Sequence, residues 1–310
     1  MALAWWRLEM AALPELEESL LWKLQALGIP RVAISHKPEA PHDRRLLAWL
    51  PESDWPGPQR AQLEQALAPL ALPFGLTLPA IRWSHQADED WSRSWKQHWQ
   101  PDPVGERLLI LPAWLELPPE HAERLVIRMD PGSAFGTGSH PTTRLCLEAI
   151  ECLAQQRGAA AGTAPSLGPI RVADLGCGSG ILGIAALLQG ASAVAAADTD
   201  SLAVRATGEN AAVSGFSDRL RVVEGSVDEL AALLEGQPAD LLLCNILAPV
   251  IEALCPAFAA LLAPDGVGLL SGLLVEQAPG LAQALAAQGW EAQLAAVQDR
   301  WGLMMLHKAH

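Results

Sequence analysis

The chain has 310 residues, of which half are hydrophobic and 18% are charged, so it is long enough for two domains and able to bury a substantial core. No apolar run reaches the length of a membrane-spanning helix, and the N-terminus carries Arg7 and Glu9 where a signal peptide would be apolar, which predicts a cytoplasmic protein that does not bind membranes. The five cysteines are odd in number and include no C-x-x-C pair, which favours reduced thiols over a disulfide framework or a zinc site.

The net charge of −14 is concentrated in the C-terminal two thirds of the chain. Residues 1–100 contain 10 Lys/Arg and 12 Asp/Glu, whereas residues 101–310 contain 11 and 23. Acidic surface disfavours direct binding to nucleic acid, whose phosphates attract basic side chains, and it favours a basic protein partner. The acidity could equally serve only solubility, and charge alone leaves both interpretations open.

Residues 1–85 are predicted to form a small α+β domain. Glutamates lie early in the first predicted helix and Gly28 follows its end, as helix dipoles and C-caps favour. The order of elements is β-α-β-β-α-β, which is typical of a ferredoxin-like domain. The predicted strands cover residues 5–10, 31–36, 45–50 and 76–83, and the predicted helices cover residues 14–27 and 58–70.

Residues 86–127 are predicted to form a Trp-rich linker helix and a connecting segment. Trp91, Trp95 and Trp99 recur at a spacing of four, which places them on one face of a helix. A platform for stacking nucleic-acid bases would need more positive charge nearby. We therefore expect a packed connector between two domains.

From residue 128 to residue 310 strands alternate with helices, which predicts a mostly parallel sheet covered on both faces. Only four residues separate the last two strands, too few for a parallel crossover, so these strands should pair antiparallel. Residues 157–169 are predicted to be a surface loop of low complexity. The predicted strands cover residues 170–173, 192–197, 220–223, 240–244, 267–271, 291–298 and 303–307, and the predicted helices cover residues 142–156, 180–189, 201–213, 227–234, 249–262 and 277–288.

The strongest motif is D-L-G-C-G-S-G, which begins at Asp174 between a predicted strand and an apolar helix. Gly176 and Gly178 allow a tight turn and a close approach to a ligand at the carboxyl edge of the sheet. The glycines alone could serve only the turn. The next strand, however, ends at Asp198, 22 residues after Gly176, where a carboxylate can bind the hydroxyls of a ribose. Together these features predict a cofactor that contains adenosine.

Two common phosphate-binding patterns are missing from this motif. Ile181 stands where a dinucleotide fingerprint needs its third small residue, and the chain has no Walker A sequence. The motif instead resembles motif I of class I methyltransferases, whose cofactor S-adenosylmethionine carries a sulfonium amino acid in place of phosphates. No His, Cys and Asp cluster has the spacing of a metal site, so we expect no metal.

Two further motifs accompany the glycine-rich one. D-P-G-S-A-F-G-T-G-S-H-P-T-T runs from Asp130 to Thr143, and L-C-N-I-L-A-P places Asn245 at the carboxyl end of a strand. There an amide can bind a cofactor or an amine nucleophile. His140 suggests a general base and Cys177 a nucleophile, but we expect His140 to shape its loop and Cys177 to pack beneath the glycines.

The three motifs together resemble the ribosomal protein L11 methyltransferase family, and the layout of the whole chain is similar to it. The resemblance implies that Thr143, Gly176, Asp198 and Asn245 contact S-adenosylmethionine, and Gly178 shares the same glycine motif. It also implies that the N-terminal domain binds L11, free or on the ribosome, and that the linker lets the catalytic domain reach several amino groups. The insertion at residues 157–169 and the long N-terminal segment depart from the usual pattern. Nothing demands more than a monomer.

Asn245 is the candidate catalytic residue, with the hypothesis that its side chain and the carbonyls of Ile246 and Leu247 orient an amine. Enzymes that methylate exocyclic or amide nitrogens commonly read N-P-P-Y at this point, whereas this chain reads N-I-L-A. Without an aromatic ring to stack on a flat group, the site suits a lysine ε-amine or an N-terminal α-amine. The alternatives are a class I methyltransferase acting on RNA or a protein glutamine, a nicotinamide-dependent oxidoreductase, and an adapter without catalysis.

Overall fold

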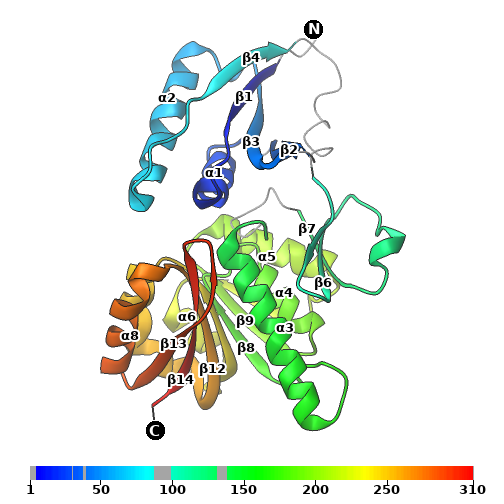
Figure 1. Ribbon diagram of the computed structural model, residues 1–310, viewed down its shortest axis with the longest axis vertical. Coiled ribbons are helices and arrows are strands. Elements are labelled where there is room, and N and C mark those ends of the chain that lie inside the picture. Colours follow the sequence, from blue (N-terminus) through cyan, green and yellow to red (C-terminus); the bar gives the residue numbers. More distant parts are fainter. Residues whose placement is uncertain (1–4, 30, 38–39, 87–98, 131–137, 310) are drawn as a thin grey trace. The chain divides into compact units, whose positions relative to one another are not determined.

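The computed structural model describes residues 5–29, 31–37, 40–86, 99–130 and 138–309. The chain divides into two compact units, Met1–Gln100 with Pro131–His140 and Pro101–Asp130 with Pro141–His310 (Figure 1). Among the described residues, the search for a helix long and apolar enough to cross a membrane finds none.

The N-terminal unit has the ferredoxin-like topology expected from the sequence. Its elements are β1 (Trp5–Ala11), α1 (Pro14–Ala26), β2 (Val32–Lys37), β3 (Ala40–Pro51), α2 (Gly57–Leu67), the 3₁₀ helix η1 (Ala68–Phe74) and β4 (Arg82–Gln86). The sheet is antiparallel with the order β2-β3-β1-β4. Leu8 and Met10 of β1 share one apolar core with Leu16, Leu20 and Leu24 of α1, whose spacing of four residues keeps them on one face.

The last strand of this unit lies later than predicted. Residues 76–83 look like a strand because Leu76 and Leu78 alternate with other residues, but pairing begins only at Arg82. Leu76 and Leu78 instead pack against the core as an unpaired segment. Pro79 has no amide hydrogen to donate to a ladder, which explains the delayed start.

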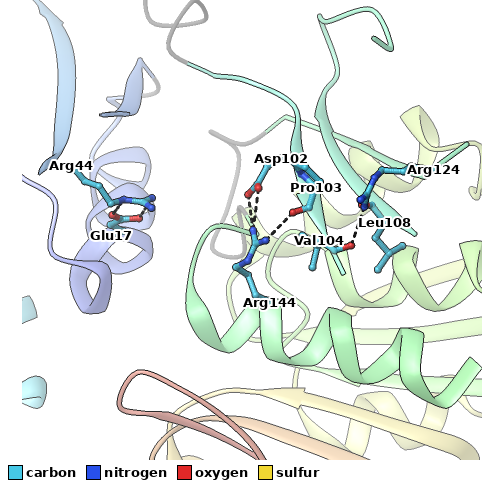
Figure 2. A network of polar contacts seen from close by, with 8 residues as sticks. All are labelled: Glu17, Arg44, Asp102, Pro103, Val104, Leu108, Arg124 and Arg144. Carbon is cyan, nitrogen blue, oxygen red and sulfur yellow. Dashed lines mark hydrogen bonds and ion pairs between the residues drawn. The ribbon is translucent and has the colours of Figure 1, made fainter. Parts of the chain in front are cut away.

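A buried ion pair joins α1 to β3 within this unit (Figure 2). Arg44 Nη2 donates to Glu17 Oε2 at 2.7 Å, and the Glu17 side chain is only 1% exposed. Burial raises the pKa of Glu17 to about 7, against the opposing effect of the neighbouring guanidinium. The carboxylate thus depends on Arg44 for its charge.

The C-terminal unit contains the predicted mostly parallel sheet. Its strands are β8 (Arg171–Leu175), β9 (Ala193–Asp198), β10 (Leu220–Glu224), β11 (Ala239–Asn245), β12 (Leu262–Leu274), β13 (Trp290–Gln298) and β14 (Trp301–Lys308). The order is β10-β9-β8-β11-β12-β14-β13, and β8 to β12 run parallel. The antiparallel pairing of β13 with β14 is confirmed, and β14 is also antiparallel to β12.

Helices cover both faces of this sheet (Figure 1). They are α3 (Pro141–Ala161), α4 (Ile181–Leu188), α5 (Ser201–Val213), α6 (Val227–Leu233), α7 (Ala248–Leu254) and α8 (Ala278–Ala287), with the short 3₁₀ helices η3 (Pro119–His121), η4 (Cys255–Ala260) and η5 (Val275–Gln277). Helices α6, α7 and α8 share one apolar core with the strands. The predicted helix 249–262 is divided into α7 and η4, because Pro256 cannot donate the next helical hydrogen bond.

Residues 101–130 form part of the C-terminal unit, although residues 101–127 are predicted to belong to a connecting segment. They contain a three-stranded sheet of β5 (Asp102–Val104), β6 (Leu108–Pro112) and β7 (Leu125–Met129). All five residues of β6 are buried, as a continuous apolar run favours. Of the three tryptophans predicted on one helical face, Trp91 and Trp95 lie outside the described residues, and the indole of Trp99 donates to Val32 O at 3.3 Å.

Two arginines hold this small sheet, one from α3 and one from within residues 101–130 themselves (Figure 2). Arg144 of α3 donates to both carboxylate oxygens of Asp102, at 3.1 and 2.9 Å, and to Pro103 O at 2.8 Å. Arg124 donates to Leu108 O at 2.8 Å. The start of β5 is therefore held by the helix that also carries Thr143.

The predicted loop 157–169 is partly helical. Helix α3 continues to Ala161 because Gly158 is followed by three alanines, which are strong helix formers. The remaining loop is hydrogen-bonded to its neighbours, with Ser166 N donating to Ala154 O at 2.9 Å and Leu167 N donating to Gln189 O at 2.7 Å. The insertion is thus packed against the unit.

Candidate functional site

The glycine motif forms a tight loop between β8 and α4. Gly176, Gly178 and Gly180 all have positive φ, of 73°, 56° and 78°. A Cβ at Gly176 would lie 2.3 Å from Ile246 Cγ2, so no larger residue fits there. The amides of Gly176 and Cys177 both donate to Ala197 O, at 2.8 and 3.1 Å, which fixes the loop to the neighbouring strand β9.

Asp198 lies at the end of β9 directly beside this loop. Its Oδ2 accepts from Gly178 N at 2.9 Å, and its Oδ1 accepts from Asp200 N at 3.0 Å. Burial raises the pKa of this carboxyl group, while the two amide bonds lower it. The structure thus brings together Asp198 and Gly178, as the spacing of the motifs predicts.

Asn245 and Thr143 also meet at this edge of the sheet, although 102 residues separate them. Asn245 ends β11, Thr143 is buried in the first turn of α3, and Asn245 Nδ2 donates to Thr143 Oγ1 at 3.3 Å. Asn245 Oδ1 is buried and has no hydrogen-bond partner among the described residues. An unpaired buried carbonyl oxygen is costly, which marks it as an acceptor for a group that binds here.

The carbonyl of Leu247 cannot act as the second acceptor that the sequence suggested. It accepts from Val250 N at 2.9 Å and from Ile251 N at 3.1 Å, because Leu247 is the N-cap of α7. These bonds occupy both of its lone pairs. The carbonyl oxygen of Ile246 lies against Gly272, where a Cβ would be only 2.2 Å away. Asn245 Oδ1 is therefore the acceptor that the local structure leaves open.

Asp174, at the end of β8, is another buried residue with an oxygen that lacks a hydrogen-bond partner among the described residues. Its Oδ2 accepts from Gly183 N at 3.1 Å, and its Oδ1 has no hydrogen-bond partner within the described part of the chain. Burial raises the pKa of Asp174 to about 7. Cys177 beside it is also buried, and burial raises the pKa of its thiol well above the usual value, so a protonated packing thiol fits better than a nucleophile.

Two buried polar residues of α5, which belong to none of the three sequence motifs, hold the glycine loop. Thr207 Oγ1 donates to Gly178 O at 2.9 Å, and Asn210 Nδ2 donates to Ser179 O at 2.9 Å. Asn210 Oδ1 also accepts from Asp130 N at 3.0 Å. A signal was present, because Thr207 and Asn210 are three residues apart on the helix face that otherwise buries alanines.

The motif that runs from Asp130 to Thr143 is described only at its two ends. Residues 131–137 lie outside the described residues, so their predicted loop stays a prediction. His140 is buried, and burial lowers its pKa to about 4, which keeps the imidazole neutral. Within the described ranges, no group of three or more His, Cys, Asp or Glu side chains could hold a metal ion.

Comparison with known proteins agrees with this arrangement. Residues 4–309 match the family model of ribosomal protein L11 methyltransferase (PrmA). A ribosomal protein L11 methyltransferase of Synechococcus sp. (strain RCC307) is 61% identical over 306 residues, which are 99% of this chain and 98% of that protein. One of Parasynechococcus marenigrum (strain WH8102) is 64% identical over 300 residues, 96% of this chain and all of the relative.

A solved structure is similar as well. The crystal structure of a ribosomal protein L11 methylase from Lactobacillus delbrueckii subsp. bulgaricus matches with a TM-score of 0.57 and 32% identity, covering 68% of this chain and all of that one. The family model spans nearly the whole sequence, and the relatives align over almost their full length. The chain therefore belongs to the ribosomal protein L11 methyltransferase family.

Proposed function

We propose that this protein transfers methyl groups from S-adenosylmethionine to amino groups of ribosomal protein L11. The names of the relatives support the substrate. The observation that carries the chemistry is the buried Oδ1 of Asn245, which lies at the carboxyl edge of the sheet without a hydrogen-bond partner among the described residues. Such an atom is suited to accept a hydrogen bond from an incoming amine.

The residues at this edge fit S-adenosylmethionine. The side chains of Asp198 and Asn245 present acceptor oxygens, which suit the hydroxyl and ammonium donors of this cofactor and would repel a phosphate. In our proposal Asp198 binds the ribose hydroxyls, and the backbone at Gly176 and Gly178 lies against the methionine part. Thr143 contributes through its hydrogen bond with Asn245.

S-adenosylmethionine supplies a methyl group that is already activated by its sulfonium charge, so the task of the protein is alignment. Asn245 Oδ1 accepts an N–H of the amine and thereby directs the nitrogen lone pair. Thr143 accepts from the other end of the same amide and prevents it from turning over. A lysine has an ordinary pKa of about 10.4 and must lose its proton, which transfer from water into a drier site favours. Proximity and orientation then provide most of the catalysis.

We further propose the roles of the two parts of the chain. Residues 1–85 form the domain that recognises L11, and residues 128–310 carry the methyltransferase site. Residues 86–127 connect these two domains, and their strands β5 and β6 belong to the catalytic unit. A basic partner also suits the acidic composition of residues 101–310. L11 free or on the ribosome, a cytoplasmic location and a monomeric enzyme stay predictions.

The test is incubation of the purified protein with labelled S-adenosylmethionine and ribosomal proteins from undermethylated cells, followed by mass spectrometry. We expect label on lysine ε-amines or the N-terminal α-amine of L11. Label on another protein would refute the substrate and keep the donor. No label with intact cofactor binding would contradict the proposal.

A parallel incubation with ribosomal RNA separates the main alternative. We expect no label on RNA and none on a protein glutamine, because Ile246, Leu247 and Ala248 follow Asn245 and provide no aromatic ring for stacking on a planar group. Labelled RNA would replace the amine by a base as the acceptor.

A further inference from the structure

Helix α5 is hydrogen-bonded to two backbone segments of the catalytic unit, the glycine loop and the end of β7. Asn210 is 2% exposed, and its amide binds Ser179 O of the glycine loop on one side and Asp130 N at the end of β7 on the other. The chemistry of the two partners fixes the orientation of the amide, since a carbonyl needs a donor and an N–H needs an acceptor. Only an amide side chain offers both at this length.

The glycine loop is consequently held from two directions at adjacent peptides. Thr207 binds the carbonyl of Gly178, Asn210 binds the carbonyl of Ser179, and Asp198 binds the amide of Gly178. The carbonyl of Ser179 shares a peptide plane with the amide of Gly180, which donates to Cys177 O at 2.8 Å. The carbonyl of Cys177 in turn shares a peptide plane with the amide of Gly178 that donates to Asp198, so the hydrogen bond from Asn210 helps to fix where this amide points. The position of the Asp198 carboxylate therefore depends on α5 through Gly178.

Helix α5 is also joined to Asp198 along the chain. It begins at Ser201 with Asp200 as its N-cap, and Asp200 Oδ1 accepts from Leu202 N at 2.9 Å. A single rigid helix thus sets the carboxylate from one end and the glycine loop from its middle.

We propose that Asn210 is a positioning residue for the S-adenosylmethionine site, which sets the glycine loop and, through it, Asp198, without contacting the cofactor. This inference rests on the proposed function. In this role Asn210 affects the affinity for S-adenosylmethionine and does not affect the affinity for L11. A purely structural role would affect both affinities together.

Ser214, the C-cap residue of the same helix, provides a matched control. Its Oγ donates to Arg128 O at 2.9 Å, so it also joins the helix end to β7, but among the described residues its side chain makes no hydrogen bond to the glycine loop. Both residues are thus used to attach the helix, and only Asn210 reaches the loop.

The experiment compares the wild-type protein with Asn210→Asp, Thr207→Val and Ser214→Ala. The affinity for S-adenosylmethionine is measured by calorimetry, and the unfolding free energy by urea titration, so that all binding is measured on folded protein. At pH 8 the carboxylate in Asn210→Asp can still accept from Asp130 N, but it has no hydrogen to donate to Ser179 O. We expect its cofactor affinity to fall by about tenfold or more, and that of Thr207→Val by a smaller factor. Ser214→Ala should stay within about twofold of the wild type.

Two further readouts separate positioning from loss of stability. In steady-state assays Asn210→Asp should raise the KM for S-adenosylmethionine and leave the KM for L11 unchanged. Lowering the pH should reduce the difference in S-adenosylmethionine affinity between Asn210→Asp and the wild type, because a protonated carboxyl group can again donate to Ser179 O.

The outcomes differ for the inference and for the proposed function. Wild-type affinity in Asn210→Asp would overturn the inference, and so would losses of affinity in Asn210→Asp and Ser214→Ala that simply follow their losses of stability. A wild-type protein that does not bind S-adenosylmethionine at all would overturn the proposed function and this inference with it.

Discussion

The buried carboxylate of Glu17 in the N-terminal unit and two buried polar groups of the C-terminal unit are paired in different ways. In the N-terminal unit, the 1% exposed carboxylate of Glu17 is matched by the guanidinium of Arg44. In the C-terminal unit, Asn245 and Asp174 each keep one buried oxygen without a hydrogen-bond partner among the described residues. The first arrangement satisfies a charge within the fold, whereas the second leaves acceptors open.

This difference separates stability from function. A buried polar group without a partner costs about 1–3 kcal/mol, so an open acceptor at the carboxyl edge of the sheet suits a group that binds there. We therefore expect changes at the Glu17 pair to affect unfolding and changes at Asn245 to affect methyl transfer.

Replacement of Arg44 by alanine should lower the unfolding free energy by about 3 kcal/mol, because Glu17 would stay buried without its partner. Urea titration measures the change. Cofactor affinity should be unaffected. Arg205→Ala is the control, since it removes an exposed pair with Glu209 and should cost less than about 0.5 kcal/mol. Equal costs in the two variants would contradict the importance of the buried pair.

Replacement of Asn245 by alanine should reduce kcat for methylation of L11 by about a hundredfold, because the amine loses the acceptor that aligns it. The unfolding free energy should change by less than about 1 kcal/mol, since only the hydrogen bond with Thr143 is lost. Single-turnover assays and urea titration measure the two quantities. Glu252→Gln on the exposed side of α7 serves as a control. Unchanged turnover in Asn245→Ala would remove this residue from the mechanism.

Much of the fold could be predicted because the signals were local. The buried strands β8, β9 and β11 are largely apolar, and the four-residue connection between β13 and β14 leaves only an antiparallel pairing. Strand β4 was placed too early, although Pro79, which delays the pairing, is visible in the sequence. Leu76 and Leu78 have a strand-like pattern, but they reach the core without pairing.

The site was predictable only in part. Gly178, Asp198 and Asn245 could be found because parallel strands bring their carboxyl ends to one edge. Thr207 and Asn210 were missed, since polar residues beside the exposed Gly208 and Glu209 look like surface positions in a sequence. Which oxygen stays unpaired depends on contacts between distant segments, and no sequence pattern shows that.

The titration of the buried Asp174 carboxyl group should make the stability of the protein depend on pH. Its pKa in the folded protein is about 7, above the ordinary value of 3.8, so the folded state holds this proton more tightly. Stability contributed by protonated Asp174 is therefore fully present below about pH 4 and is lost progressively as the pH rises through 7. Relative to the wild type, Asp174→Asn should gain about 2 kcal/mol of unfolding free energy between pH 5 and pH 7. Glu17 titrates in both proteins, so its contribution cancels in the difference between them. If the unfolding free energies of the two proteins changed in parallel with pH, the raised pKa of Asp174 would be contradicted.

Asp198 combines features of the paired Glu17 and of the open acceptors Asn245 and Asp174. Both of its oxygens accept a backbone amide, and the residue is still partly exposed. Asp198→Asn replaces one acceptor by a donor, which must face the amide of either Gly178 or Asp200. We expect the affinity for S-adenosylmethionine to fall by about tenfold, the smallest of these effects, because the amide oxygen keeps one backbone bond and can still accept from a hydroxyl. Asp200→Asn should bind normally, since asparagine caps α5 as well as aspartate does. If both variants lost affinity equally, the negative charge at this end of β9, and not the hydrogen bonds of Asp198, would be what the cofactor requires.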